Sequence, residues 1–216
     1  MKKYLTSFSL FDKLFIVGAI IIIIVSSLLG KSDLLNIVIA ICGVIYVFLI
    51  GKKQKRAYFY GMINVVLYAF VMLNKGLYFN FIYNLFYSFP ILIYGYYCWS
   101  KIKVETINEL TIKWKNILYV FCGFMACLMI LVILFSNNKA MYLDYITSIS
   151  GFIAMFLMAR KYKEQWLLWN LNNLTNVILW FILLINDFAN IGVFIMWVIY
   201  LINSLIGYFN WEKKKN

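Results

Sequence analysis

The chain has 216 residues, of which 65% are hydrophobic, 20% are aromatic and only 13% are charged. A soluble domain has about 25% charged residues, and one core of this size could not bury so many apolar side chains, so the composition predicts an integral membrane protein. The 20 Lys and Arg residues outnumber the 8 Asp and Glu residues, but they fall in short clusters between apolar runs, which is typical of cytoplasmic loops and argues against nucleic-acid binding.

A membrane-spanning helix needs about 20 mostly apolar residues. The sequence predicts an all-α polytopic protein with about eight such helices, in chain order 14–29, 34–50, 57–73, 77–99, 117–135, 141–159, 166–185 and 190–211. The first is the shortest, and its residues leave open whether it spans the bilayer or lies in the interface. The N-terminal segment lacks an A-x-A-like cleavage site, so we expect it to be retained.

The distribution of Lys and Arg predicts the orientation. Seventeen of them fall in the N-terminus, the C-terminus and the second, fourth and sixth loops, whereas Lys31, Lys75 and Lys139 fall on the opposite side. Loops rich in Lys and Arg stay in the cytoplasm. We therefore expect a multi-pass protein of the cell membrane with both termini in the cytoplasm. This requires an even number of spans and so favours a spanning first helix.

Two halves of the chain resemble each other. "INVVLYAFVMLN" (63–74) matches "TNVILWFILLIN" (175–186) at an offset of 112, and "YGYYCWSK" (94–101) matches "IGYFNWEK" (206–213) at the same offset. Upstream, "CGVIYVFL" (42–49) matches "SGFIAMFL" (150–157) at an offset of 108. Parallel three-helix repeats need one extra helix between them to restore orientation, as in some transporters. We therefore expect an N-terminal helix (1–33), a first three-helix repeat (34–99), a cytoplasmic loop and linker helix (100–140), and a second repeat with a basic tail (141–216).

The stretch "WNLNNLTNVILW" (169–180) places four asparagines within an apolar helix. Asparagine in hydrocarbon costs free energy unless it finds partners. Hydrogen bonding between helices is one explanation. A binding site is the other, because side chains three and four positions apart share a helix face and amides beside aromatic rings suit a flat heterocycle that carries hydroxyls. The substrate-binding candidates are Trp169, Asn173, Asn176 and Trp180, with Asn64, Tyr68, Asn84, Tyr87, Tyr200 and Asn203 from the repeat mate and neighbouring helices.

Three other tryptophans lie beside basic loops. Trp99, Trp211 and Trp166 are expected in the aromatic belt at the membrane surface. Pro90 interrupts its helix, and either a hinge or a packing bend would explain it.

The reactive residues argue against catalysis. Histidine is absent, and the four cysteines lack metal-ligand spacing, so we expect no catalytic residue, metal or cofactor. The acids, Asp12, Asp33, Glu105, Glu109, Asp144, Glu164, Asp187 and Glu212, lie in expected loops or near helix ends. Proton- and sodium-driven carriers often need a carboxylate in mid-membrane, so facilitated diffusion is favoured over ion coupling. A membrane-embedded enzyme or an accessory subunit is the less favoured alternative.

Three segments, "YNLFYSFPILIYGYYCW" (83–99), "EQWLLWNLNNLTNVILW" (164–180) and "MWVIYLINSLIGYFNW" (196–211), resemble the PnuC-type nicotinamide riboside transporters. The resemblance covers about residues 34–211 and implies a three-plus-one-plus-three core like that of SWEET proteins, assembled as a homotrimer. It also implies facilitated diffusion of a small unphosphorylated vitamin or nucleoside, which a cytoplasmic kinase then traps. Nicotinamide riboside is the first expectation, and thiamine, riboflavin and deoxynucleosides, carried by relatives, are alternatives. The resemblance also implies that Trp169, Asn173, Asn176 and Trp180 bind the substrate.

Overall fold

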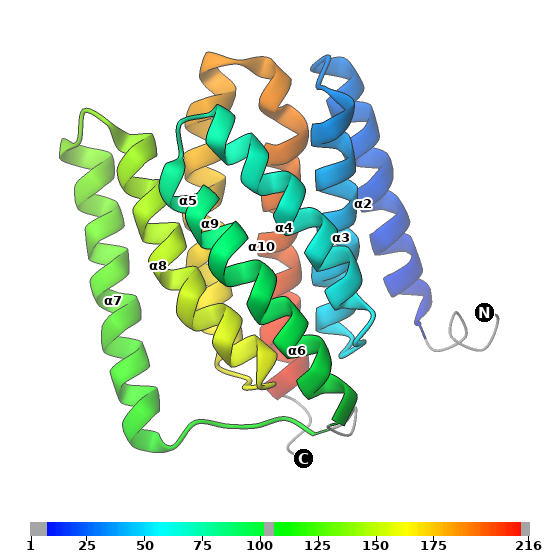
Figure 1. Cartoon of the computed structure of the whole chain (residues 1–216), viewed down its shortest axis with the longest axis vertical. Coiled ribbons are helices and arrows are strands. Elements are labelled where there is room, and N and C mark those ends of the chain that lie inside the picture. Colours follow the sequence, from blue (N-terminus) through cyan, green and yellow to red (C-terminus); the bar gives the residue numbers. More distant parts are fainter. Residues whose placement is uncertain (1–7, 102–105, 213–216) are drawn as a thin grey trace.

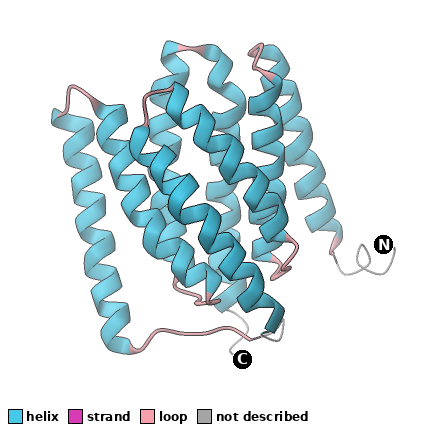
Figure 2. Ribbon diagram, viewed as in Figure 1, coloured by secondary structure: helices cyan, strands magenta, loops and turns pink. Residues whose placement is uncertain are grey.

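The computed structural model describes residues 8–101 and 106–212, and these form a bundle of helices without any strand (Figures 1 and 2). The expected all-α class is confirmed. The basic residues before position 8 and after position 212, and Glu105 in the expected cytoplasmic loop, lie outside the described residues. The elements are α2 (Leu10–Leu29), α3 (Leu34–Gly51), α4 (Ala57–Asn74), α5 (Tyr78–Ile82), the π-helix η1 (Tyr83–Ser88), α6 (Phe89–Lys101), α7 (Ile112–Phe135), α8 (Lys139–Ala159), α9 (Gln165–Asn186), the 3-10 helix η2 (Phe188–Asn190) and α10 (Ile191–Glu212).

Seven helices in the described ranges are each long and apolar enough to cross a membrane. The continuous run α5–η1–α6 makes one further pass through the bundle (Figure 1). The first helix begins at Leu10, four residues before its predicted start, because a capping box precedes it. The Ser9 hydroxyl accepts the N–H of Asp12, and the Asp12 carboxylate accepts the N–H of Ser9, which satisfies two backbone donors at the helix start.

The run α5–η1–α6 was predicted as one helix over 77–99. Its middle is instead a π-helix, which ends two residues before Pro90. Proline has no N–H to donate to the carbonyl one turn earlier, and its ring crowds that carbonyl. Wider turns of this kind commonly accommodate such a disruption and often occur at functional sites. Pro90 therefore coincides with a local change of helix type.

Helix α2 begins and α10 ends at the same end of the bundle (Figure 1). In the interior, α9 packs between α8 and α10, and α3 packs between α4 and α10. Helix α2 packs on the outside against α3 and α10, and α7 packs on the outside against α8 and α9. Only 17% of the residues in the most apolar stretch of α7 are buried, so most of this helix faces outward.

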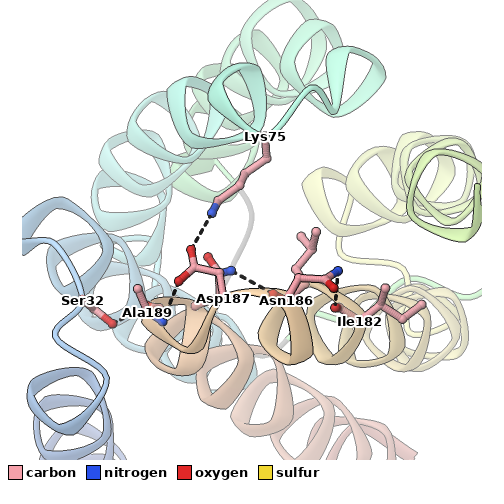
Figure 3. Close-up of polar contacts among 8 residues, drawn as sticks. Ser32, Lys75, Ile182, Asn186, Asp187 and Ala189 are labelled. Atoms are coloured by element: carbon pink, nitrogen blue, oxygen red, sulfur yellow. Dashed lines mark hydrogen bonds and ion pairs between the residues drawn. The ribbon is translucent and has the colours of Figure 1, made fainter.

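At the other end of the bundle, three loops are joined by polar contacts (Figure 3). The Lys75 ammonium, just after α4, lies 3.3 Å from the Asp187 carboxylate, just after α9. The Ser32 hydroxyl, after α2, donates to the carbonyl of Ala189 in η2. These contacts connect the turns that follow α2, α4 and α9.

Trp99 and Trp211 do not form the expected aromatic belt. Each is only 3% exposed, and each donates its indole N–H to a backbone carbonyl, at 3.1 Å to Met158 and 3.2 Å to Gly51. The belt interpretation is wrong for these two residues because each side chain packs beneath the loop of the opposite half of the bundle. Trp166 is also buried, at 2% exposure.

Those loops each carry a buried lysine. Lys53 and Lys161 have left-handed backbone conformations, with φ of 57° and 56°. The ammonium of Lys53 lies 5.1 Å from the centre of the Trp211 ring, and that of Lys161 lies 4.8 Å from the centre of the Trp99 ring. Attraction between an ammonium and an indole ring stabilises both loops against the bundle.

Candidate functional site

A cavity lies between the helices in the bundle interior. Its wall consists of aromatic, methionine and aliphatic side chains with several amides and hydroxyls. Eight of the residues expected to bind substrate line it, namely Asn64, Tyr68, Asn84, Trp169, Asn173, Asn176, Tyr200 and Asn203.

Two asparagines of α9 hold neighbouring helices. The Asn172 amide donates to the carbonyl of Thr147 at 2.6 Å and to the hydroxyl of Ser150 at 2.9 Å, both on α8. The Asn173 amide donates to the carbonyl of Tyr200 at 3.2 Å and to the hydroxyl of Ser204 at 3.0 Å, both on α10. These asparagines therefore join helices and also line the cavity, so the two sequence explanations are compatible.

Within the described part of the chain, Asn176 bonds only within its own helix. Its amide nitrogen donates to the carbonyl and to the side-chain oxygen of Asn172, at 3.0 and 3.1 Å. Its counterpart Asn64 on α4 donates to the carbonyl of Ile39 on α3 at 2.9 Å. Asn203 on α10 similarly donates to the carbonyl of Val47 on α3 at 2.9 Å. The wall is therefore built from amides whose nitrogens are held by backbone.

Several buried polar atoms of the cavity wall have no hydrogen-bond partner in the described part of the chain. Among them are the Asn173 side-chain oxygen, the Trp166 indole N–H and the Tyr200 hydroxyl. None of the three residues is more than 7% exposed. A buried polar atom without a partner costs about 1–3 kcal/mol. The wall thus presents an acceptor, a donor and a hydroxyl that a polar ligand can satisfy.

Two expected binding residues do not line the cavity. Trp180 is fully buried and donates its indole N–H to the Tyr68 hydroxyl at 2.8 Å. It lies one turn beyond Asn176, where Tyr68 of α4 packs against it, so Tyr68 meets the cavity in its place. Tyr87 lies against Phe152 of α8, with ring centres 3.9 Å apart, and donates to the Phe152 carbonyl at 2.7 Å.

The position of Tyr87 follows from the π-helix. In an α-helix Tyr87 would share a face with Asn84. A π-helix has wider turns, with hydrogen bonds from i to i+5, so the side chain four positions later, Ser88, shares that face instead. Ser88 lines the cavity together with Asn84.

Sequence reasoning missed several lining residues. Asn80 and Ser88 lie four positions before and after the predicted Asn84. Trp197 and Ser204 lie three positions before and four positions after the predicted Tyr200, so helical spacing could have identified all four. Trp166 also lines the cavity, although its position beside a basic loop suggested the membrane surface. The further lining residues with polar or aromatic side chains are Tyr46, Tyr83, Thr147 and Asn172.

Asp144 is buried inside the bundle, unlike an acidic residue in an exposed loop. It lies in the second turn of α8 and is only 1% exposed. Its carboxylate accepts a hydrogen bond from the Asn80 amide, and Asn80 also donates to the Thr147 hydroxyl at 3.0 Å. Asp144 lies near a helix end but does not contact solvent, because α5 covers this part of α8.

The family model described as "Nicotinamide mononucleotide transporter" matches residues 33–213. The chain belongs to this family of membrane transporters. A "Nicotinamide riboside transporter PnuC" of Neisseria mucosa is 31% identical over 82% of this chain and 71% of its own length. Those of Haemophilus influenzae and Escherichia coli are each 27% identical, over 83% and 77% of this chain and 79% and 78% of their own lengths.

A solved structure supports the same conclusion. The "Crystal structure of the Vitamin B3 transporter PnuC" matches with a TM-score of 0.78 at 27% identity, covering 96% of this chain and 92% of that one. The predicted family, the helical membrane fold and a role in transport are confirmed. The family's function in transport also decides against the alternative of a membrane-embedded enzyme.

Proposed function

We propose that this transporter carries nicotinamide riboside, without a phosphate, by facilitated diffusion. One observation carries the choice of cargo. Among the described residues that line the cavity, none is Lys or Arg. A phosphate group carries a charge of about −1.5 to −2 at neutral pH, and burying it without a cation would be very costly. The riboside has no such group, and the names of the PnuC relatives agree with this cargo.

The polar and aromatic groups of the wall match the parts of such a molecule. Nicotinamide riboside has a flat ring, a carboxamide and ribose hydroxyls. Trp169 and Tyr68 offer aromatic surface, while Asn173, Asn176 and Tyr200 offer hydrogen bonds for the carboxamide or hydroxyls. Thiamine, riboflavin and deoxynucleosides also have rings and polar groups, so they serve as comparison ligands.

A cavity without basic residues also agrees with trapping in the cytoplasm. A cytoplasmic kinase that phosphorylates the riboside converts it into an anion, which this cavity would disfavour. Net uptake then needs no coupled ion. The basic residues at the end of the bundle where α2 begins and α10 ends, among them Lys52, Arg56, Lys115 and Arg160, support cytoplasmic termini in the cell membrane. The outward-facing α7 offers surface for a homotrimer.

Calorimetry on the purified protein tests the cargo. We expect nicotinamide riboside to bind at least ten-fold more tightly than nicotinamide mononucleotide, and more tightly than thiamine, riboflavin or deoxynucleosides. Equal affinity for the mononucleotide would overturn the argument from the cavity wall. In liposomes, riboside uptake should proceed without a pH or sodium gradient and should be unaffected by a protonophore. Concentrative uptake that collapses with an imposed gradient would exclude facilitated diffusion.

A further inference from the structure

Asp144 is buried without an ion-pair partner among the described residues. Other acids of the described chain are compensated or exposed. Asp12 pairs with Lys52, Asp187 pairs with Lys75, Glu109 and Glu164 pair with Lys115, and Asp33 is exposed. An ionisable side chain within a membrane helix is costly and usually has a functional partner. The remaining question is which cation neutralises the Asp144 carboxylate.

The neighbours of Asp144 satisfy its oxygens but bring no net charge. The Asn80 amide donates to the carboxylate, and the backbone N–H groups of Phe79 and Asn80 lie beside it. These groups orient the carboxylate and make it part of the contact between α5 and α8. A neutral amide at position 144 could make similar contacts, so they alone give no reason for a charged residue.

Asp144 lies directly behind the cavity wall. The Asn80 amide donates to the Asp144 carboxylate, and Thr147, one helical turn after Asp144, donates its hydroxyl to the Asp144 carbonyl. Asn80 and Thr147 both line the cavity. The carboxylate is therefore one side chain away from the space that a ligand would fill, with low-dielectric surroundings that weaken its field little.

We propose that Asp144 is a specificity-determining residue, which makes the cavity favour a cargo with a positively charged ring over a neutral one. This rests on the proposed function, because the pyridinium ring of nicotinamide riboside carries such a charge. The cargo itself then provides the counter-charge that the described protein residues do not. The same field disfavours phosphorylated compounds, in agreement with the lack of basic residues in the wall.

Two ligands that differ in ring charge test the proposal. Nicotinamide riboside and its reduced 1,4-dihydro form share the ribose and the carboxamide, but the reduced ring is neutral. The wild-type protein should bind the cation at least ten-fold more tightly. Asp144→Asn should weaken binding of the cation by about ten-fold, the size expected for unit charges about 10 Å apart at an effective dielectric constant of about 20. Binding of the neutral form should change less than two-fold.

Two further variants control for structural damage. Asp187→Asn removes an exposed, paired acid outside the cavity and should leave both affinities unchanged. The double variant Asn80→Asp with Asp144→Asn exchanges two side chains that already touch and moves the charge to the cavity wall. It should keep the preference for the cation even if Asp144→Asn alone is too unstable to purify.

The outcomes separate the two proposals. A wild-type protein that binds neither form overturns the proposed cargo, and the role of Asp144 with it. A wild-type protein that binds both forms, with an Asp144→Asn variant that weakens both equally, leaves the cargo standing and overturns only the role of Asp144. A double variant that has lost the preference for the cation also overturns it.

Discussion

Trp180 donates a hydrogen bond to Tyr68, and the two residues are 112 positions apart, the offset at which the two halves of the sequence align. Lys75 and Asp187 form an ion pair at the same separation. Matched residues of two repeats meet each other where they lie beside the axis that relates the repeats. These contacts therefore support our proposal that residues 34–99 and 141–211 form parallel repeats around the cavity.

The contact between Trp180 and Tyr68 predicts coupled effects of substitution. Trp180→Phe and Tyr68→Phe each leave one buried group of the hydrogen bond without its partner, at a cost of about 1–3 kcal/mol of stability. The double variant removes both groups and should lose clearly less than the sum of the two losses. Thermal unfolding of all four proteins in detergent measures the difference. Additive losses would mean that the hydrogen bond contributes nothing.

Asn176→Leu should weaken cargo binding while the fold persists. Among the described residues, the Asn176 amide bonds only within α9, so its loss breaks no direct hydrogen bond to another described helix. If Asn176 makes one or two hydrogen bonds to the cargo, each worth about 0.5–1.5 kcal/mol, affinity should fall by roughly ten-fold. The dissociation constant and the melting temperature are measured on the same purified sample.

Asn186→Leu is the matched control for that variant. Asn186 lies on the same helix and makes the same kind of bond, from its amide to the Ile182 carbonyl four residues earlier, at 3.1 Å (Figure 3). It is exposed and lies outside the cavity, so its replacement should leave affinity unchanged. If Asn176→Leu lowers the melting temperature but keeps wild-type affinity, Asn176 has a purely structural role and does not bind the cargo.

Gly207→Ala should disturb the position of Trp166. A methyl group at Gly207 would lie 2.7 Å from the Trp166 ring, which is closer than packed carbon atoms approach. The ring is held by Trp211, with ring centres 5.6 Å apart, so it can move only toward the cavity or with its neighbours. Overpacking of this kind costs about 1–3 kcal/mol, and we expect lower stability together with weaker cargo binding.

The control for this variant is Gly123→Ala on the outward-facing α7. A methyl group there would meet no atom within 4 Å. Alanine favours a helix over glycine by up to about 1 kcal/mol, so stability should stay the same or rise, with unchanged affinity. Equal effects of the two substitutions would contradict the proposed tight contact at Gly207.

The ion pair at Asp187 should make a small, pH-dependent contribution to stability. The N–H of Ala189 and the ammonium of Lys75 hold the pKa of the Asp187 carboxyl below its ordinary value of 3.8. A lowered carboxyl pKa stabilises the fold at pH values above 3.8, and this stabilisation is lost as the pH falls through the lowered pKa. Because the Asp187 side chain is 51% exposed, the contribution should not exceed about 1 kcal/mol.

Asp187→Asn isolates the charge, because asparagine keeps an oxygen that can accept the Ala189 N–H. At pH 7 the variant should melt slightly below the wild-type protein, and the difference should disappear well below pH 3.8. A difference of the same size at both pH values would assign the effect to something other than the carboxylate charge.

The spans could be predicted because each pass must offer about 20 apolar residues to the lipid, and helical spacing was enough to bring Asn64, Asn173 and Asn176 to one cavity. The failures have tertiary causes. Trp180 lies on the predicted helix face, but Tyr68 packs between it and the cavity, and Tyr68 comes from a helix more than 100 residues away in the sequence. Trp166 is buried because Gly207, on another helix, makes room for its ring. No local pattern around either tryptophan contains this information.

The π-helix Tyr83–Ser88 has a consequence for how an unsymmetrical molecule is held. If the two repeats contributed identical sides to the cavity wall, such a molecule would bind equally well in either of two opposite orientations. One side here presents Asn84 and Ser88 from a widened helix, whereas the other presents Trp197, Tyr200 and Ser204 from a regular one. The two orientations are therefore unequal in energy, and each passage through the bundle should begin with the same end of the molecule foremost.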